Sequence, residues 1–182
     1  MRDLLLVIDL QKVYADGAPW ACRETGRACA AVRRLLGSGK PAEVIFTRFD
    51  APVQPRGAWG DYNRAYADIN ADARLGEFMD ELGDAPSRWP VYSKSTYSSL
   101  TVPEVLSAAR AADRVLLTGV VAECCVLATM MALIDEGVPV VYLSDAVAGQ
   151  SEAMERSVAA VAAALSPVHT RVMTVGEYLA AT

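Results

Sequence analysis

Six short apolar runs restrict the fold of this chain more than any other feature of its sequence. The runs are rich in Val, Ile and Leu, with little polar alternation, and cover residues 4–8, 44–46, 91–92, 115–117, 138–143 and 172–175. Short, nearly continuous runs are typical of strands that are buried on both faces. We therefore expect these segments to be the strands of a parallel sheet.

Patterns of helical periodicity lie between the runs. They cover residues 19–36, 75–82, 102–112, 123–135 and 151–165, several of them ending at Gly or Pro. Strands that alternate with helices predict a parallel sheet covered on both faces. The expected fold class is α/β, with one domain over residues 1–182 and a central parallel six-stranded sheet in a three-layer α/β/α, Rossmann-like arrangement.

Composition and charge exclude several functions. The formal net charge is -5, and Lys and Arg form no long cluster, so we expect no nucleic-acid or membrane partner. The apolar N-terminal stretch is interrupted by Asp9, which makes it too short for a signal peptide or a membrane span. We expect a cytoplasmic protein, in which the four cysteines are thiols and do not form a metal site.

The chain has a single histidine, His169, in a loop without an acidic neighbour. Sites with several histidine ligands are therefore impossible, and a histidine-based triad would depend on this one residue. We expect His169 to be a solvated surface residue. The chemistry of this protein should run without histidine.

Two polar residues follow apolar runs at the places where strands should end. Ligands of parallel sheets bind at the carboxyl ends of the strands. Asp9 ends the first run. Partial burial there would raise the pKa of an acid, which suits proton transfer. Acids at such places also cap helices or bind magnesium. Lys94 follows the third run and could pair with Asp9, or close a strand on the surface.

A pair of cysteines follows the fourth run. Cys124 and Cys125 fall in the first turn of the predicted helix 123–135. The positive end of the helix dipole there would lower the pKa of a thiol below its free value of about 8.5. The backbone N–H groups of such a turn suit an oxyanion hole. Position in the sequence does not show which of the two cysteines would be the nucleophile. The alternative is a cysteine that packs in the core as a small apolar residue.

Together, Asp9 before Leu10-Gln11, Lys94 before Tyr97-Ser98, and the segment 119–126 with Thr129 resemble the Asp, Lys and Cys motifs of the isochorismatase-like cysteine hydrolases. The resemblance runs from residue 4 to about residue 148. It implies a catalytic triad of Asp9, Lys94 and Cys125, with Cys125 favoured over Cys124 by the glycine six residues before it and the threonine four residues after it.

The resemblance also implies features of the backbone and of the reaction. The peptide bond between Val120 and Val121 would be the cis bond of the family, and the N–H groups of Val121 and Cys125 would form the oxyanion hole. The chain departs from the family's nicotinamidases, which bind a metal through Asp and His after the second strand, because residues 47–55 contain no histidine. The expected enzyme is an amidohydrolase that needs no metal and no cofactor.

The substrate is less well defined than the chemistry. It should be a small molecule with an amide, carbamoyl, ureido or lactam bond. Candidate binding residues are Tyr14, Arg48, Trp59, Tyr62 and Tyr97, whereas Trp20 is expected to pack at the first helix. The irregular segment 50–73 is a lid or a subunit interface, and the family resemblance favours a homo-oligomer, either a dimer or a tetramer.

Three other interpretations remain open. An isochorismatase-type hydrolase would cleave a vinyl ether by protonation and would need no thiol. A doubly wound signalling domain would use Asp9 and Lys94 for phosphoryl chemistry, but Leu10 stands where a second acid is expected. A redox sensor would use Cys124 and Cys125.

Overall fold

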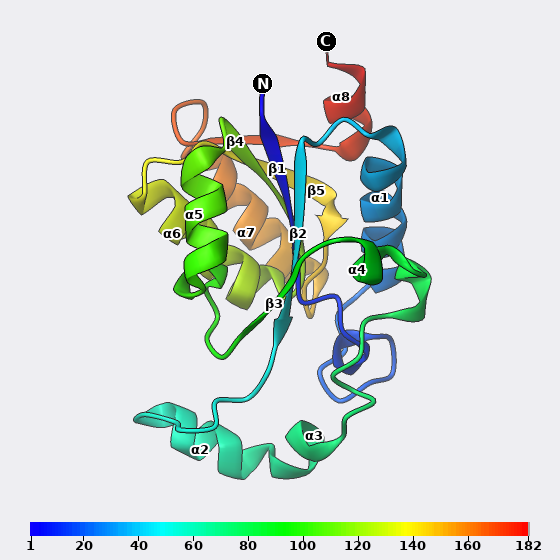
Figure 1. Cartoon of the computed structure of the whole chain (residues 1–182), viewed down its shortest axis with the longest axis vertical. Helices are drawn as coiled ribbons and strands as arrows, with labels where there is room; N and C mark the ends of the chain where they lie inside the picture. Colours follow the sequence, from blue (N-terminus) through cyan, green and yellow to red (C-terminus); the bar gives the residue numbers. More distant parts are fainter. Residues whose placement is uncertain (182) are drawn as a thin grey trace.

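The computed structural model describes residues 1–181, and its centre is a six-stranded parallel sheet (Figure 1). The strand order is β3-β2-β1-β4-β5-β6, so the direction of winding reverses between β1 and β4. The strands are β1 (Asp3–Ile8), β2 (Glu43–Phe49), β3 (Val91–Lys94), β4 (Arg114–Gly119), β5 (Val140–Val147) and β6 (Thr170–Met173). All six predicted strands are present, and the predicted α/β class is confirmed.

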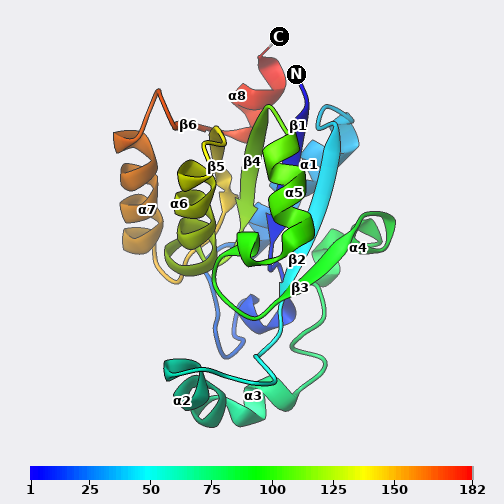
Figure 2. The same cartoon turned by 60° about the vertical axis from the view of Figure 1, so that its left-hand side comes forward.

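Helices cover both faces of the sheet, as Figures 1 and 2 show. One face carries α1 (Thr25–Ser38) and α8 (Val175–Ala180); the other carries α5 (Pro103–Ala111), α6 (Leu127–Asp135) and α7 (Glu152–Ala164). The short helices α2 (Ala58–Ala65), α3 (Ala67–Ala71) and α4 (Ala85–Arg88) lie in the long connection from β2 to β3. Within residues 1–181 we find no helix with the length and hydropathy of a membrane span.

The first strand shows why the sheet needs two covering layers. Leu4, Leu6 and Ile8 pack into the core under α5, α6 and α7. Leu5 and Val7 point to the opposite core, which contains α1 and α8. Because neighbouring side chains of a strand point to opposite faces, a continuous apolar run can satisfy both cores at once.

The structure corrects the predicted helix at 75–82. Only Asp80–Leu82 form a short 3-10 turn, η2. The preceding backbone pairs with the chain after β1 instead of with itself: Lys12 N donates to Glu77 O at 2.8 Å, and Met79 N donates to Leu10 O at 2.9 Å. These tertiary hydrogen bonds replace the i to i−4 bonds that a helix would need.

The predicted helix 19–36 begins later, at Thr25. Before it, Trp20 N donates to Val13 O at 3.1 Å and Cys22 N donates to Tyr14 O at 2.9 Å, so this backbone is also used by tertiary contacts. The segment 50–73 contains α2 and α3, although its sequence shows little periodicity.

The end of the chain also differs from the prediction. The last run includes Val175, but the strand ends at Met173, because Thr174 and Glu177 form a capping box that begins α8. Asp145 accepts a hydrogen bond from Val175 N at 2.7 Å, at the same helix N-terminus. His169 lies exposed on the surface, as predicted.

Gly119, the last residue of β4, generates a prediction about stability. Its φ is 107°, and a Cβ there would overlap the carbonyl of Ile8. We expect Gly119→Ala to lower the free energy of unfolding by about 2–4 kcal/mol, because strain and overlap add. Urea denaturation measures the loss.

The matched control is Gly137→Ala. Gly137 also has a positive φ, of 73°, but no atom lies within 4 Å of the added Cβ. Backbone strain alone should cost this variant about 1 kcal/mol. Equal losses for the two variants would show that the contact with Ile8 is unimportant.

Candidate active site

The structure brings Asp9, Lys94 and Cys125 together at the carboxyl ends of three strands. Asp9 directly follows β1, Lys94 ends β3, and Cys125 lies in the turn after β4. Lys94 Nζ is 2.6 Å from Asp9 Oδ2 and donates a hydrogen bond to Cys125 Sγ at 3.3 Å. The side chains of Asp9 and Lys94 are completely buried. A carboxylate, an ammonium and a thiol therefore meet at one point inside the protein.

The two oxygens of the Asp9 carboxylate have different partners. Its backbone has a φ of 50°, and its amide donates to Thr47 O at 3.1 Å. Thr47 Oγ1 donates to Oδ1 at 2.8 Å. Oδ2 is buried and accepts no hydrogen bond from the described residues, although the Lys94 ammonium is its ion-pair partner. Oδ2 thus has one ionic partner and keeps a lone pair that can accept a proton.

Lys94 compensates the charges around it. Besides Asp9 and Cys125, its ammonium contacts Thr96 O at 3.0 Å and lies over the ring of Phe49. Burial alone would lower the pKa of Lys94, but the charge of Asp9 and the sulfur of Cys125 act in the opposite direction, and the net pKa is raised. The ammonium therefore stays protonated and compensates negative charge in a buried site.

Cys125 lies in a turn whose geometry differs from the predicted one. Residues Ala122–Val126 form a π-type turn, η4, and the regular helix α6 begins only at Leu127. Cys124 N and Val126 N both donate to Val121 O at 3.1 Å. Cys125 is therefore not in the first turn of a regular α-helix.

The expectation of a lowered thiol pKa at Cys125 is wrong. Burial raises the pKa of this thiol, the charge of Asp9 raises it further, and the opposing effect of Lys94 is not sufficient. A thiol that is protonated near neutral pH can donate its proton to the neighbouring Asp9, so the resting site holds a thiol beside an ion pair.

The segment before Cys125 is fixed by backbone hydrogen bonds. Val120 N donates to Ile8 O at 2.9 Å, and Ala122 N donates to Ala148 O at 2.9 Å. The peptide bond between Val120 and Val121 is cis. The turn is thus anchored both to β1 and to the loop after β5.

A cavity of about 140 Å³ opens onto Cys125. It is lined by Tyr14, Trp20, Tyr62, Tyr66, Tyr97, Val121, Cys124, Cys125 and Gln150. The structure thus places the predicted residues Tyr14, Tyr62 and Tyr97 at the cavity. Cys124 is half-buried in the wall, whereas Cys125 is buried and contacts Lys94.

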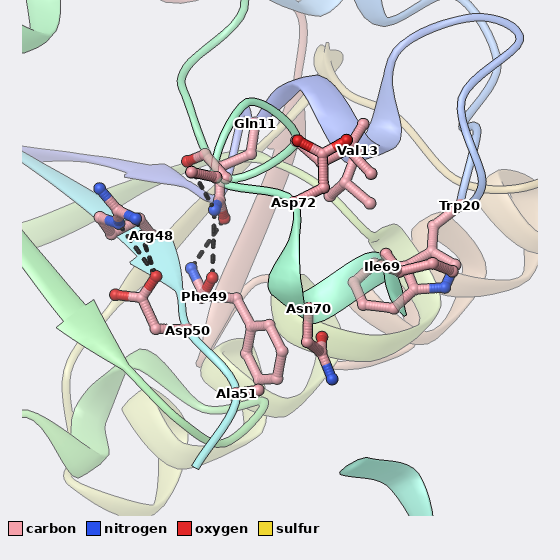
Figure 3. Close-up of a pocket in the computed structure, with 13 residues that line it drawn as sticks. Gln11, Val13, Trp20, Arg48, Phe49, Asp50, Ala51, Ile69, Asn70 and Asp72 are labelled. Atoms are coloured by element: carbon pink, nitrogen blue, oxygen red, sulfur yellow. Dashed lines mark hydrogen bonds and ion pairs between the residues drawn. The ribbon is translucent and has the colours of Figure 1, made fainter. Parts of the chain in front are cut away.

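Two predicted binding residues lie elsewhere. Arg48 lines a neighbouring cavity, where it donates to Asp50 Oδ1 at 3.2 and 2.9 Å (Figure 3), and it is absent from the lining of the Cys125 cavity. Trp59 packs its ring against Phe49 and Tyr97, outside the lining of the Cys125 cavity. Arg48 thus pairs with Asp50, which was the alternative to substrate binding, and Trp59 packs against neighbouring rings.

Sequence reasoning did not name Trp20 and Gln150 as binding residues, and it placed Tyr66 in the segment 50–73 that was expected to be a lid or a subunit interface. Trp20 was expected to pack at a helix, but it lies in a turn before α1 and lines both the Arg48 cavity (Figure 3) and the Cys125 cavity. The density of aromatic residues in 59–66 was a usable signal for Tyr66. The backbone N–H of Gln150 donates a hydrogen bond to Glu123 Oε1 at 3.2 Å, and no local sequence pattern indicates this contact.

The described residues 1–181 contain no group of three or more His, Cys, Asp or Glu side chains placed to hold a metal ion. The site residues themselves offer a nucleophile, a proton acceptor and a cation. This set suits acyl transfer through a covalent intermediate.

The ion pair generates a stability prediction. Lys94→Met removes the cation but leaves the Asp9 carboxylate buried, so we expect it to lower the free energy of unfolding by about 3–5 kcal/mol. Adding Asp9→Asn should recover part of the loss. Urea denaturation of the two single variants and the double variant gives the interaction energy between the two side chains. If the losses in free energy of unfolding simply add, the two residues do not act as a pair.

The thiol generates a prediction about pH. The pKa of Cys125 lies above its ordinary value of 9.0, so its alkylation by iodoacetamide should rise about tenfold per pH unit up to that pH. Peptide mass spectrometry measures the rate at Cys125. Lys94→Met should slow the alkylation at a given pH, because Lys94 opposes the increase in the thiol pKa that burial and Asp9 cause. A plateau near neutral pH would mean that the resting residue is a thiolate.

Comparisons with known proteins identify the family of the chain. Residues 3–175 match the Isochorismatase domain family. A cysteine hydrolase from Pseudomonas syringae pv. phaseolicola has a similar structure, with a TM-score of 0.82 and 21% identity over 98% of this chain and 91% of that one. An isochorismatase-like hydrolase from Alkaliphilus metalliredigens has a TM-score of 0.75 and 20% identity over 98% of both chains.

A MAR1 ribonuclease from Caenorhabditis elegans shares the fold as well, with a TM-score of 0.72 and 20% identity over 98% of this chain and 79% of that one. A search of curated proteins gives no match. The structural likenesses show a common architecture, and the family match covers nearly the whole chain. The chain therefore belongs to the isochorismatase family of hydrolases.

Proposed function

We propose that this protein hydrolyses a carbon–nitrogen bond of a small molecule through a thioester on Cys125. The observation that carries the proposal is the contact of Lys94 Nζ with both Asp9 Oδ2, at 2.6 Å, and Cys125 Sγ, at 3.3 Å. A nucleophile, its base and a compensating cation are thereby placed at the floor of a cavity. The bond cleaved belongs to an amide, carbamoyl, ureido or lactam group.

The first half of the reaction forms the thioester. Asp9 Oδ2 takes the proton of the Cys125 thiol, and the sulfur attacks the substrate carbonyl carbon. The backbone N–H groups of Val121 and Cys125 stabilise the oxyanion. When the carbon–nitrogen bond breaks, Asp9 gives its proton to the leaving nitrogen. Ammonia or an amine leaves, and the acyl group stays on sulfur.

The second half releases the acid. Asp9 takes a proton from water, the hydroxide attacks the thioester carbonyl, and the carbon–sulfur bond breaks. The proton on Asp9 returns to the thiolate, which restores the resting thiol. Lys94 keeps its charge throughout, so that the site never holds an uncompensated anion.

The other interpretations account for fewer of these contacts. Vinyl ether cleavage needs an acid but gives no role to a thiol beside Asp9. A phosphoryl signalling site gives no role to Cys125. A redox pair of Cys124 and Cys125 gives no role to the buried Asp9 and Lys94. We therefore propose amide-type hydrolysis, in a soluble cytoplasmic enzyme that forms homo-oligomers.

The nucleophile is tested by ammonia release from a panel of small amides and ureas. We expect Cys125→Ala to lower kcat/KM by about 1,000-fold or more, because the covalent route is lost. Cys124→Ala should lose far less, since it removes only part of the cavity wall. Mass spectrometry should find the trapped acyl group on the peptide that contains Cys125. The same peptide from Cys125→Ala should carry no acyl group.

Two results would overturn this assignment. A thioester on Cys124, with Cys125→Ala fully active, would move the nucleophile. Full activity of Cys125→Ser on an enol ether, with no ammonia release from any amide, would favour vinyl ether cleavage instead.

A further inference from the structure

Two buried threonines lie in the strands on either side of β1: Thr47 in β2 and Thr118 in β4 (Figure 1). A buried hydroxyl group needs a hydrogen-bond acceptor. Thr118 Oγ1 donates to the backbone carbonyl of Leu6 at 3.0 Å, which is a contact within the sheet. Thr47 Oγ1 instead donates to the side chain of Asp9, at 2.8 Å from Oδ1. One of the two threonines therefore bonds to the proposed base.

Thr47 holds Asp9 through two hydrogen bonds. Besides the contact of its hydroxyl, the carbonyl oxygen of Thr47 accepts a hydrogen bond from Asp9 N at 3.1 Å. The φ of Asp9 is 50°, in a region that residues other than glycine seldom adopt. The two bonds hold the backbone of Asp9 in this conformation and fix Oδ1, while Oδ2 lies 2.6 Å from Lys94 Nζ. Thr47 thus contacts the oxygen of Asp9 that does not take the proton.

The hydroxyl contact has a chemical consequence for the proton of Cys125. A hydroxyl that donates to a carboxylate stabilises the ionised form relative to the carboxylic acid. A hydrogen bond to a charged group favours that form by about tenfold to a hundredfold. In the proposed reaction one proton moves between Cys125 Sγ and Asp9 Oδ2. The hydroxyl of Thr47 should therefore favour the arrangement in which the proton is on sulfur.

Three titratable groups face Asp9 from the elements packed around it. They are Lys94 from β3, Cys125 from η4, and Tyr14 from the 3-10 turn η1 (Lys12–Tyr14). The pKa of Lys94 is raised, so its ammonium keeps its charge near neutral pH. Burial raises the pKa of Tyr14, and the charge of Asp9 raises it further, so the phenol stays neutral. The proton that can change its place is therefore the one on Cys125.

From these contacts we propose that Thr47 is a positioning residue whose hydroxyl keeps the proton on Cys125 in the resting enzyme. The inference rests on the proposed function for the direction of proton transfer, but its test needs no turnover. Without the hydroxyl, a larger fraction of molecules should hold Asp9 as a carboxylic acid and Cys125 as a thiolate. This exchange moves one proton from sulfur to oxygen and releases none to the solvent, so the fraction does not depend on pH.

Alkylation of Cys125 by iodoacetamide, measured by peptide mass spectrometry, tests the proposal because the thiolate is the reactive form. The wild-type rate should rise about tenfold between pH 6 and pH 7. Thr47→Val should react at least about tenfold faster than the wild type at pH 6 and change by less than about threefold up to pH 7. The difference should shrink toward about pH 9, where the thiol loses its proton to the solvent. Thr47→Ser keeps the hydroxyl and should restore the wild-type profile.

Two controls separate a shifted proton from a loosened structure. Thr118→Val removes an equally buried hydroxyl from the neighbouring strand and should keep the wild-type profile. Cys124 is half-buried in the same cavity wall, so its alkylation reports general access to the site. In Asp9→Asn, which has no carboxylate to take the proton, adding Thr47→Val should leave the profile unchanged. Thr47→Ala replaces Thr47→Val if the latter does not fold.

The outcomes separate the role of Thr47 from the proposed reaction. A tenfold rise per pH unit in Thr47→Val, or an equal acceleration in Thr118→Val or at Cys124, overturns the inference even if the wild type hydrolyses amides. If Thr47→Val gives the expected flat profile but the wild type releases no ammonia from any amide or urea, the proposed reaction is wrong and the role of Thr47 stands.

Discussion

The ion pair of Asp9 and Lys94 is the interaction on which the rest of the site depends. Both side chains are fully buried, so neither charge is tolerable without the other. The pair holds together the ends of β1 and β3, which are separated in the sheet by β2. Cys125 joins it from the far side of the point where the winding reverses. The site is thus assembled from both halves of the sheet.

The environment of Cys125 gives the site a resting state that differs from the usual activated cysteine. Burial and Asp9 outweigh Lys94, so the thiol keeps its proton. The proton is then available to the one oxygen of Asp9 that lacks a hydrogen bond. Such a site forms its nucleophile by a local proton transfer during the reaction, which limits side reactions of a free thiolate.

The sequence predicted the sheet, because buried strands leave strong local signals, whereas the triad of Asp9, Lys94 and Cys125 followed from the family resemblance, since each residue alone was a weak signal. It did not predict the cavity wall. Trp20 lines the cavity because its backbone bonds to Val13, and Arg48 is absent from it because Asp50 holds it. These partners are close in sequence, but the residue pattern left open whether Arg48 pairs with Asp50, and it did not indicate the bond from Trp20 to Val13. The predicted lowering of the pKa of the Cys125 thiol is wrong because burial raises this pKa, and the burial of one cysteine is not visible in the local sequence.

The helix α2 contributes no buried residue to the core, yet two aromatic side chains from this segment, Tyr62 and Tyr66, reach the cavity. The reacting groups stand on strands and on the turn after β4. Substitutions in this one surface helix can therefore change part of the recognition surface while the reacting groups stay in place. A family built in this way can acquire new substrates through few substitutions and at little cost in folding.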